Sequence, residues 1–495
     1  MKPFAYGESG RAHPVHPHTS VSGMVVFVRA HPLVFLIVIW VLQGCLYVFA
    51  VPPWQHPDEP THFEHARLTA DLKRLPAPNE VSLPLRRQIA QSMLQHAFWR
   101  GITQPLLNDQ TLATPYSSPL GIYTQSQPRL YYVVAAIWLQ PWLSQPVDTQ
   151  VYALRLLSVL LGIIVVACAY WSARWLFPDR NYIAVSTAFF VVLLPEFADI
   201  MSAVNNDVLA NALGAIFFLL VAFLFTHHTR WPIFLSVLLL ICLTLAAVLE
   251  TKATALELVS TVPLGLLAVF VTRVLLLSTG RSAWRIAVLV LLGAALTALV
   301  VLGVAWRDVI IGHLTNVIDW LARYLRINVS GTIKNLLDPR RVSYAFAAQI
   351  VFQSFWAVFG WRHIYLAPAW YGLPALATVI ALVGLVVGGI RMLRSKLPLE
   401  HKRRVGQYGV FALTGVFLAW TAAIARSQAA QGMGPYQSHG RYIYVALVPF
   451  AILFVAGVLA IVPWRWQRRA AAMVIVTSAF FELLSFWGYL FPYYH

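Results

Sequence analysis

The chain has 495 residues, of which 59% are hydrophobic and only 11% are charged. Soluble domains contain roughly 45–50% apolar residues, so this composition excludes an ordinary soluble protein and indicates a polytopic membrane protein. The net charge of +17 does not indicate a nucleic-acid partner, because the basic residues lie mostly in short loops between apolar segments, as the positive-inside rule describes.

The N-terminal 30 residues are polar and rich in proline and histidine, and they show no helical period, so we expect a disordered cytoplasmic tail. The first span, residues 34–51, follows Arg29, which places the N-terminus in the cytoplasm. A cleaved signal peptide is the alternative, because Val-Phe-Ala precedes Val51. The apolar run is long for such a peptide and begins well into the chain, which favours a retained anchor. Residues 31–495 are expected to form a single transmembrane domain.

Residues 52–67, PPWQHPDEPTHFEHAR, form the densest cluster of titratable side chains and follow the first span directly. Carboxylates beside imidazoles at a membrane boundary can serve as general bases, metal ligands or ion-pathway groups. A polar connecting loop would explain the polarity of the segment. It would not explain the prolines on both sides of Asp58 and Glu59, which fix φ and limit where this acidic pair can point. We interpret the segment as a catalytic loop.

A large outer loop is predicted over residues 52–150. Residues 61–75 and 85–99 have helical patterns that carry both apolar and basic positions, as expected of helices on the membrane surface. Residues 130–143 are apolar but fall short of the ~20 residues needed to span, and Pro141 interrupts them. We therefore predict an interfacial or re-entrant helix there.

The remaining apolar runs predict ten further spans. A second outer region, residues 307–371, includes an interfacial helix over 344–361. The fold class is thus all-α, with about eleven transmembrane helices, the N-terminus in the cytoplasm and the C-terminus outside. This orientation puts the basic loops in the cytoplasm. The ten spans are 152–171, 181–195, 208–225, 231–248, 254–271, 286–306, 372–390, 410–425, 442–462 and 470–491.

With this topology every unusual polar motif falls on the same outer face. An active site built from loops over a helical bundle requires such convergence. The motifs are Asp58-Glu59, Gln127-Pro128-Arg129, Asn205-Asn206-Asp207, Lys252 and Gly440-Arg441-Tyr442.

These motifs carry a resemblance that covers most of the chain from Val34. P-D-E-P-T-H-F after the first span, Q-P-R-L-Y-Y before a short apolar helix, the second-loop Asp, the Lys, F-G-W and G-R-Y together resemble a bacterial family of polytopic membrane proteins of uncharacterised function. That family is similar to the GT-C glycosyltransferases, which include protein O-mannosyltransferases and lipid A aminoarabinose transferases. Arg129 stands where the family has the second proline of Q-P-P, which leaves the role of Arg129 open.

The resemblance implies transfer of a sugar, of the inverting type, from a polyprenyl-phosphate carrier to a glycan, lipid or protein acceptor at the outer face of the bacterial inner membrane. Asp58 matches the first acidic residue of the GT-C loop motif and would be the general base, with Glu59 as its partner. A like-charge neighbour and partial burial are expected to raise the pKa of one of the two acids. The residues that would bind substrate are Gln127, Arg129, Tyr132, Lys252, Arg441 and Tyr442.

Each assignment has a plainer structural alternative. Lys252 at a helix end is as readily a snorkelling lysine, and Arg441 an interface anchor. Asp207 is a suitable cap for the helix that begins at residue 208. A divalent cation, Mg or Mn, held by Asp58 or Glu59 together with Asp207 and His62 would also suit a carboxylate-rich site that binds a phosphate sugar.

Two other functions compete with the transferase. A secondary transporter would also be polytopic, but transporters place ionisable residues near the bilayer midplane and often contain repeats. The sequence shows no repeat, and its spans carry little charge beyond Glu257 and Glu482. A lipid-linked oligosaccharide polymerase or ligase would share the outer-face arginines, whereas the long acidic first loop favours transfer of a monosaccharide.

Overall fold

The computed structural model describes residues 30–100, 107–117, 120–121, 127–227, 229–252, 258, 344–429 and 438–495. The predicted tail up to residue 29, the predicted spans 254–271 and 286–306, and residues 307–343 of the second outer region lie outside this part of the chain. Within it the protein is helical apart from two short antiparallel hairpins. The hairpins are β1 (Tyr116–Ser117) with β2 (Leu120–Gly121), and β3 (Val358–Phe359) with β4 (Ile364–Tyr365).

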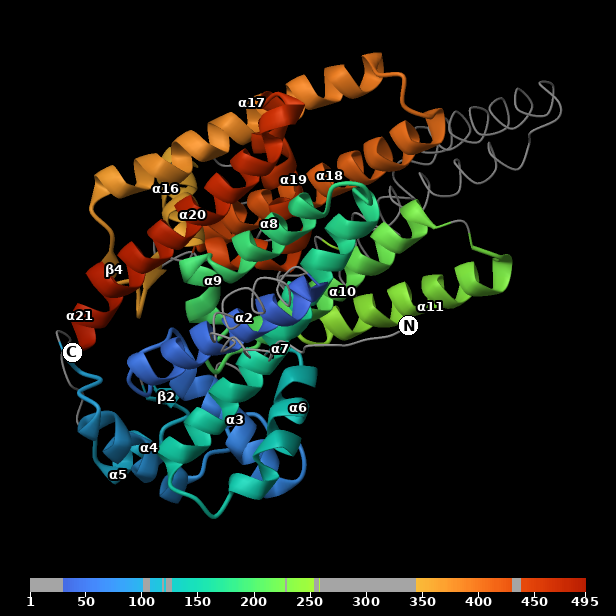
Figure 1. Cartoon of the computed structure of the whole chain (residues 1–495). Helices are drawn as coiled ribbons and strands as arrows, with labels where there is room; N and C mark the ends of the chain where they lie inside the picture. The colour runs from blue at the N-terminus through green and yellow to red at the C-terminus, as the bar shows by residue number, and fades with distance from the viewer. Residues whose placement is uncertain are drawn as a thin grey trace, which may run out of the picture.

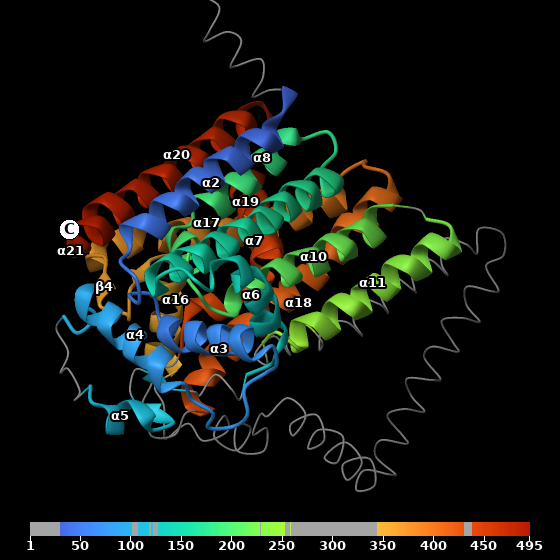
Figure 2. The same cartoon turned by 90° about the horizontal axis from the view of Figure 1, so that it is seen from below.

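The long helices of the bundle pack around α19 and α7 (Figure 1). α19 contacts α8, α17 and α18, while α7 contacts α2, α8 and α10. Figure 2 shows α2, α7, α10 and α11 side by side. The helices are α2 (Pro32–Ala50), α7 (Val147–Leu176), α8 (Asn181–Val192), α10 (Asp207–Thr226), α11 (Trp231–Leu249), α17 (Gly372–Arg394), α18 (Leu399–Ala429), α19 (Leu447–Ile461) and α20 (Gln467–Ser485).

Shorter elements join and cap these helices. α3, α4, α5 and α6 gather at one end of the bundle (Figure 1). The short elements are α3 (Glu59–Leu72), α4 (Leu83–Gln95), α5 (Asp109–Ala113), α6 (Leu130–Leu139), η2 (Gln140–Trp142), α9 (Pro195–Ile200), α16 (Tyr344–Trp356), η4 (Pro368–Tyr371), η6 (Gly440–Ala446), η7 (Trp464–Trp466), η8 (Phe486–Leu490) and α21 (Phe491–Tyr494).

Eight helical segments in the described part are long and apolar enough to cross a membrane. They match eight of the nine predicted spans that lie there, which confirms a multi-pass membrane protein. The ninth, predicted over 181–195, is α8, which has only 12 residues and is shorter than the ~20 that a span requires. That predicted span was too long, because the helix breaks at Leu193 and Leu194 and Pro195 starts the separate helix α9.

The predicted interfacial segment over 130–143 is α6 followed by the single turn η2, which contains Pro141. Ten helical residues extend about 15 Å, half of the ~30 Å hydrocarbon core, so α6 cannot span. It packs against α3 instead. The helices predicted over 61–75 and 85–99 correspond to α3 and α4, and the buried Arg86 of α4 donates to Glu64 of α3 at 2.6 Å.

Close packing inside the bundle depends on small residues and on one polar contact. α17 and α19 cross where a Cβ on Gly384 would collide with the backbone of Gly457, so only glycine allows this approach. The carboxylate of Glu482 in α20 accepts hydrogen bonds at 2.9 Å from Gln43 and Tyr47 of α2. Glu482, one of the few charged residues within the predicted spans, therefore joins α20 to α2.

The two ends of the bundle differ in charge and connectivity. The C-terminal His495 contacts the carbonyl of Ala50 through Nε2 at 3.0 Å, so the chain ends where α2 ends, at the end that carries α3 to α6. At the opposite end Tyr182 donates to Gln467 at 2.8 Å and Arg404 donates to the carbonyl of Thr226 at 2.8 Å. The loops that the sequence assigns to one face thus meet at one end.

Candidate active site

The loop after α2 presents one acid to the surroundings and buries the other. Every residue from 53 to 66 is buried except Asp58, whose side chain is 29% exposed. Asp58 has φ 63°, in the left-handed region, and Trp54 earlier in the loop has φ 75°. Aspartate is one of the few residues besides glycine that adopt this conformation readily. α3 then begins at Glu59 with Pro60 in its first turn, so the loop ends with Asp58 at its tip.

Glu59, next to it, is fully buried in a network that leaves no room for substrate. Arg155 of α7 binds both carboxylate oxygens, at 2.8 and 2.7 Å, and the backbone N–H groups of Trp54 and Val204 donate to them at 2.8 and 3.2 Å. Burial acts to raise the pKa of Glu59, but the charge and hydrogen bonds of Arg155 outweigh it, so the pKa lies below its ordinary value. Glu59 is therefore not the acid of the pair whose pKa was expected to rise.

Arg155, which the sequence analysis missed, also holds the loop by its backbone. It donates to the carbonyls of Val48, Val51 and Pro52 at 3.0, 2.6 and 2.9 Å. A signal was present in the sequence, since Arg155 stands within an otherwise apolar predicted span. An ionisable residue in such a position is functional or paired by default.

Four of the predicted site residues form a row of alternating charges. Arg441 donates to Asp58 at 2.9 Å, and its Nε lies 3.6 Å from Asp207 on the other side. Lys252 makes an ion pair with the second oxygen of Asp207. We call these residues, Asp58, Arg441, Asp207 and Lys252, the charge row. Asp207 and Lys252 are buried and Asp58 is the most exposed member, so the row runs from the interior to an accessible carboxylate.

Tyr442 lies beside both cations of the charge row. Its ring centroid is 5.0 Å from Lys252 Nζ and 5.4 Å from the guanidinium carbon of Arg441, within the range of cation–π attraction. The tyrosine is buried and thereby limits the water around the two cations. The predicted G-R-Y motif thus supplies two adjacent parts of one site.

Backbone contacts bring the segments of the charge row together. Asn206 donates to the carbonyl of Thr251 at 3.2 Å, and the N–H of Leu130 donates to the carbonyl of Glu250 at 2.8 Å. The N–H of Gly440 donates to Ser354 of α16 at 2.8 Å, and a Cβ at Gly440 would collide with the backbone of Phe355. Asp207 is the first residue of α10 and Asn206 stands at the capping position, while the carboxylate of Asp207 faces Lys252 and Arg441.

His62 and Tyr132 lie next to the row and contact each other. His62 Nδ1 is 2.9 Å from the Tyr132 hydroxyl, and the Tyr132 ring stacks on His65 with centroids 3.6 Å apart. The pKa of His62 is lowered to about 3, mainly by burial and also by the charges of Lys252 and Arg441, although Asp58 acts to raise it. His62 is therefore neutral at physiological pH and adds no charge to the site.

Gln127 and Arg129 lie just before Leu130, the first residue of α6. Because the N–H of Leu130 donates to the carbonyl of Glu250, this part of the backbone lies close to the segment that carries Lys252. Arg129 is exposed and Gln127 is half-buried. Within the described part of the chain, no hydrogen bond or ion pair joins either side chain to the charge row. The substrate-binding role of both stays a prediction.

The sequence analysis also missed a second group of buried polar side chains near the charge row. His439 Nε2 is 3.6 Å from Glu196 of α9, and His56 Nδ1 is 3.3 Å from Asp199. Burial and then Asp199 raise the pKa of Glu196, while burial and the nearby Arg441 lower that of His439, so both are driven toward their neutral forms. Glu196 also accepts from the N–H of Val358 at 2.7 Å, which fixes the F-G-W hairpin. The sequence signal was the acidic segment EFAD directly after an apolar helix.

Each of the predicted metal ligands, Asp58, Glu59, Asp207 and His62, contacts another side chain in the structure. Among the described residues no group of three or more His, Cys, Asp or Glu side chains is placed to share a metal ion. Both oxygens of Asp207 face cations, and His62 Nδ1 contacts Tyr132. No chemical step is assigned to Mg or Mn below, and the predicted metal site stays a prediction.

No protein-family model matches the sequence, and no curated protein matches it either. Among solved structures the chain is similar to the archaeal oligosaccharyltransferase AglB from Archaeoglobus fulgidus, in complex with an inhibitory peptide and a dolichol-phosphate. The TM-score is 0.50 with 12% sequence identity, over 92% of this chain and 56% of the archaeal chain. This protein thus corresponds to just over half the length of AglB. At this identity the likeness shows the fold alone, and it confirms the predicted all-α membrane fold.

The buried pair of Glu59 and Arg155 yields a stability prediction. Replacing Glu59 with Gln leaves the Arg155 charge buried without a counter-charge, which should lower the free energy of unfolding by about 3–5 kcal/mol. Thermal unfolding of the purified protein in detergent measures this as a lower Tm. The matched control is Glu80→Gln, because Glu80 makes the same two-pronged contact with Arg74 at the exposed surface and should change Tm little. Equal Tm shifts for the two variants would contradict the role given to Arg155.

Proposed function

We propose that this protein is a membrane glycosyltransferase that moves a sugar from a polyprenyl-phosphate carrier to a glycan, lipid or protein acceptor at the outer face of the bacterial inner membrane. The observation that carries the proposal is the charge row, in which one accessible carboxylate contacts Arg441, and Asp207 joins Arg441 to Lys252, at one end of a GT-C-like bundle. Fold likeness to an oligosaccharyltransferase solved with a dolichol-phosphate supports the same class of lipid-linked donor.

The reaction would be a direct displacement at the sugar. The acceptor hydroxyl attacks the anomeric carbon and gives its proton to Asp58, while the bond from that carbon to the carrier phosphate oxygen breaks. The leaving polyprenyl phosphate takes the bonding electrons, and its negative charge is met by Arg441 and Lys252. One displacement from the face opposite the leaving group inverts the configuration of the sugar.

The geometry suits these roles because ion pairs with Asp207 hold the two cations in fixed positions. The buried Nε of Arg441 makes no hydrogen bond to the described residues, although Asp207 lies near it. Asp207 holds Arg441 and Lys252 side by side and keeps the group close to neutral until a phosphate arrives. Preorganised cations of this kind stabilise developing charge without reorganisation during the reaction.

Glu59 acts in this proposal as a positioning residue, not as a group that touches substrate. Its contacts to Arg155 and to the backbone of Trp54 and Val204 fix the loop that ends in Asp58. The transporter alternative is less well supported, because the charge row lies at the helix ends and Glu482 within α20 is occupied by Gln43 and Tyr47.

Asp58→Asn should abolish sugar transfer while the protein folds and binds donor. Asparagine also adopts the left-handed conformation that this position needs, and what is lost is the proton acceptor. Loss of general-base assistance costs about 10²–10⁴ in rate. Consumption of mixed polyprenyl-phosphate sugars by the protein in membranes measures it.

The control for this substitution is Asp109→Asn, which changes an exposed acid of the same outer region. It should leave the rate unchanged. Full turnover by Asp58→Asn would refute the assignment of the base. If the wild-type protein consumes no lipid-linked sugar, the transporter becomes the better hypothesis, and transfer of whole oligosaccharides would indicate a ligase or polymerase.

Lys252→Met should weaken binding of the lipid-linked donor by about 10–100-fold, the loss of one charge-assisted contact of roughly 1.5–3 kcal/mol. Binding of a polyprenyl-phosphate sugar to purified protein measures it. Because Lys252→Met also leaves Asp207 partly unpaired, the double variant with Asp207→Asn separates the two effects. It should recover Tm but not donor affinity. If the double variant recovers donor affinity, Lys252 has a structural role and does not bind the donor phosphate.

The orientation of the bundle can be tested by labelling. In a variant whose three native cysteines are replaced, a cysteine at the exposed Ala77 should react with an impermeant thiol reagent in intact cells. A cysteine at the exposed Lys396, at the opposite end of the bundle, should react only after the cells are opened. The reverse pattern would place the charge row in the cytoplasm and remove the proposed outer-face reaction.

A further inference from the structure

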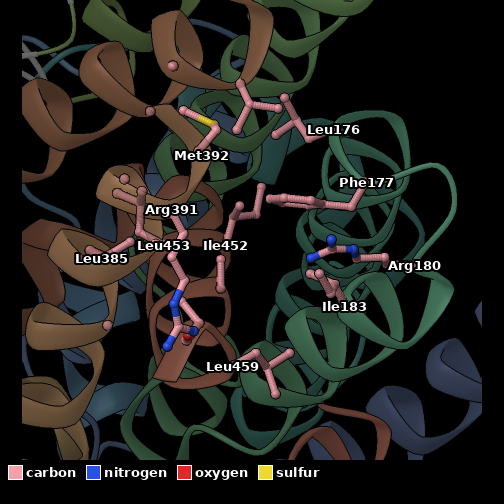
Figure 3. Close-up of a pocket in the computed structure, with 18 of the residues that line it drawn as sticks. Leu176, Phe177, Arg180, Ile183, Leu385, Arg391, Met392, Ile452, Leu453 and Leu459 are labelled. Atoms are coloured by element: carbon pink, nitrogen blue, oxygen red, sulfur yellow. The ribbon is translucent and has the colours of Figure 1, made fainter. Parts of the chain in front are cut away.

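The end of the bundle opposite the charge row contains a cavity of about 520 Å³. It lies among the ends of α7, α8, α17, α18 and α19, and its size is in the ~300–1,000 Å³ range of ligand sites. Apart from a few polar groups its walls are apolar side chains and glycines. Figure 3 shows several of them, among them Leu176, Phe177, Ile183, Leu385, Ile452 and Leu453.

Two arginines stand on opposite sides of this cavity (Figure 3). Arg180, directly before α8, is half-buried, and its guanidinium carbon lies 4.8 Å from the ring centroid of Trp464. Arg391, in the last turn of α17, donates to the carbonyl of Ala460 at 2.5 Å. Among the described residues neither guanidinium has a carboxylate partner. Each therefore retains donors for an anion.

The mouth of the cavity opens where a membrane-spanning helix carries exposed apolar side chains. Val410 and Leu413 of α18 and the neighbouring Trp464 line the cavity and are 67%, 46% and 64% exposed. On a membrane-spanning helix such exposed apolar groups face hydrocarbon, and tryptophan marks the interface with the headgroups. A ligand would therefore enter from the bilayer.

The charge around the cavity is strongly one-sided. Within the described residues, the connections at this end of the bundle contain twelve Lys and Arg residues and two acids, Asp179 and Glu400. The twelve are Arg174, Arg180, Arg230, Arg391, Arg394, Lys396, Lys402, Arg403, Arg404, Arg465, Arg468 and Arg469. Basic pockets between membrane helices attract the anionic lipids of the cytoplasmic leaflet.

We infer that this cavity binds one anionic phospholipid, with its phosphate between Arg180 and Arg391 and an acyl chain along the apolar wall. Guanidinium groups bind phosphate oxygens by paired, charge-assisted hydrogen bonds. A zwitterionic lipid would bring its own cation toward the two arginines and lose that advantage. The site lies at the far end of the bundle from the charge row and does not depend on the proposed transfer reaction.

Glycines keep the cavity open. A Cβ added at Gly389 of α17 or Gly409 of α18 would meet nothing within 4 Å, although both residues line the cavity. Glycine inside a helix is less favourable than alanine by about 0.8–1.0 kcal/mol. A leucine at either position should therefore preserve the helix while it fills the space that the acyl chain would occupy.

The test is a titration of purified, delipidated full-length protein with dioleoyl-phosphatidylglycerol or dioleoyl-phosphatidylcholine, followed by native mass spectrometry. The wild-type protein should bind the anionic lipid at least about tenfold more tightly, a difference of roughly 1.4 kcal/mol. The double variant Arg180→Gln and Arg391→Gln should lose that preference. Gly389→Leu should weaken binding of both lipids.

Two matched controls guard against general effects. Arg469→Gln removes an arginine that stacks on Trp466 at 4.4 Å at the same end but does not line the cavity. Gly372→Leu changes an equally uncrowded glycine at the other end of α17. Both should bind the anionic lipid as the wild type does. The inference is overturned if the wild type does not discriminate between the lipids, or if either test variant keeps wild-type affinity for the anionic lipid within about threefold.

Discussion

The ion pair of Glu59 and Arg155 is the interaction on which the site depends. It is fully buried, and a buried carboxylate or guanidinium that lost its partner would cost several kcal/mol. Arg155 uses its remaining donors on three carbonyls at the end of α2, so one side chain on α7 fixes both the exit from the first span and the start of α3. With the loop held in this way, Asp58 projects from an otherwise buried segment.

The charge row shows how a membrane protein can keep four ionised groups close together. Each charge has an opposite neighbour, so the group is nearly neutral and its burial costs less than that of isolated ions. The alternation also leaves the row ready for an anion, because a phosphate can join two cations that Asp207 already holds in place. The buried and neutralised histidines around it, His62 and His439, prevent a surplus of positive charge.

The two ends of the bundle treat positive charge differently. At the end with α3 to α6 the two cations of the row are each paired with an acid and set beside an aromatic ring. At the opposite end arginines outnumber acids, and Arg180 and Arg391 flank an apolar cavity without a carboxylate partner among the described residues. We propose the first arrangement for chemistry on a phosphate ester and the second for retention of a lipid.

The sequence by itself determined the membrane-spanning helices, since an apolar run of sufficient length has no other way to satisfy its backbone in a bilayer. The predicted topology placed Asp58, Asp207, Lys252 and Arg441 on one face, and the structure brings these four side chains together. Only the tertiary structure decided which charged side chains form ion pairs with one another. Asp58 and Arg441 are 383 residues apart, and Glu59 and Arg155 are 96 apart, on different loops and helices. Spacing along the sequence cannot encode contacts over such separations. The adjacent acids Asp58 and Glu59 therefore look alike in the sequence, although Asp58 is accessible and Glu59 is buried in an ion pair with Arg155.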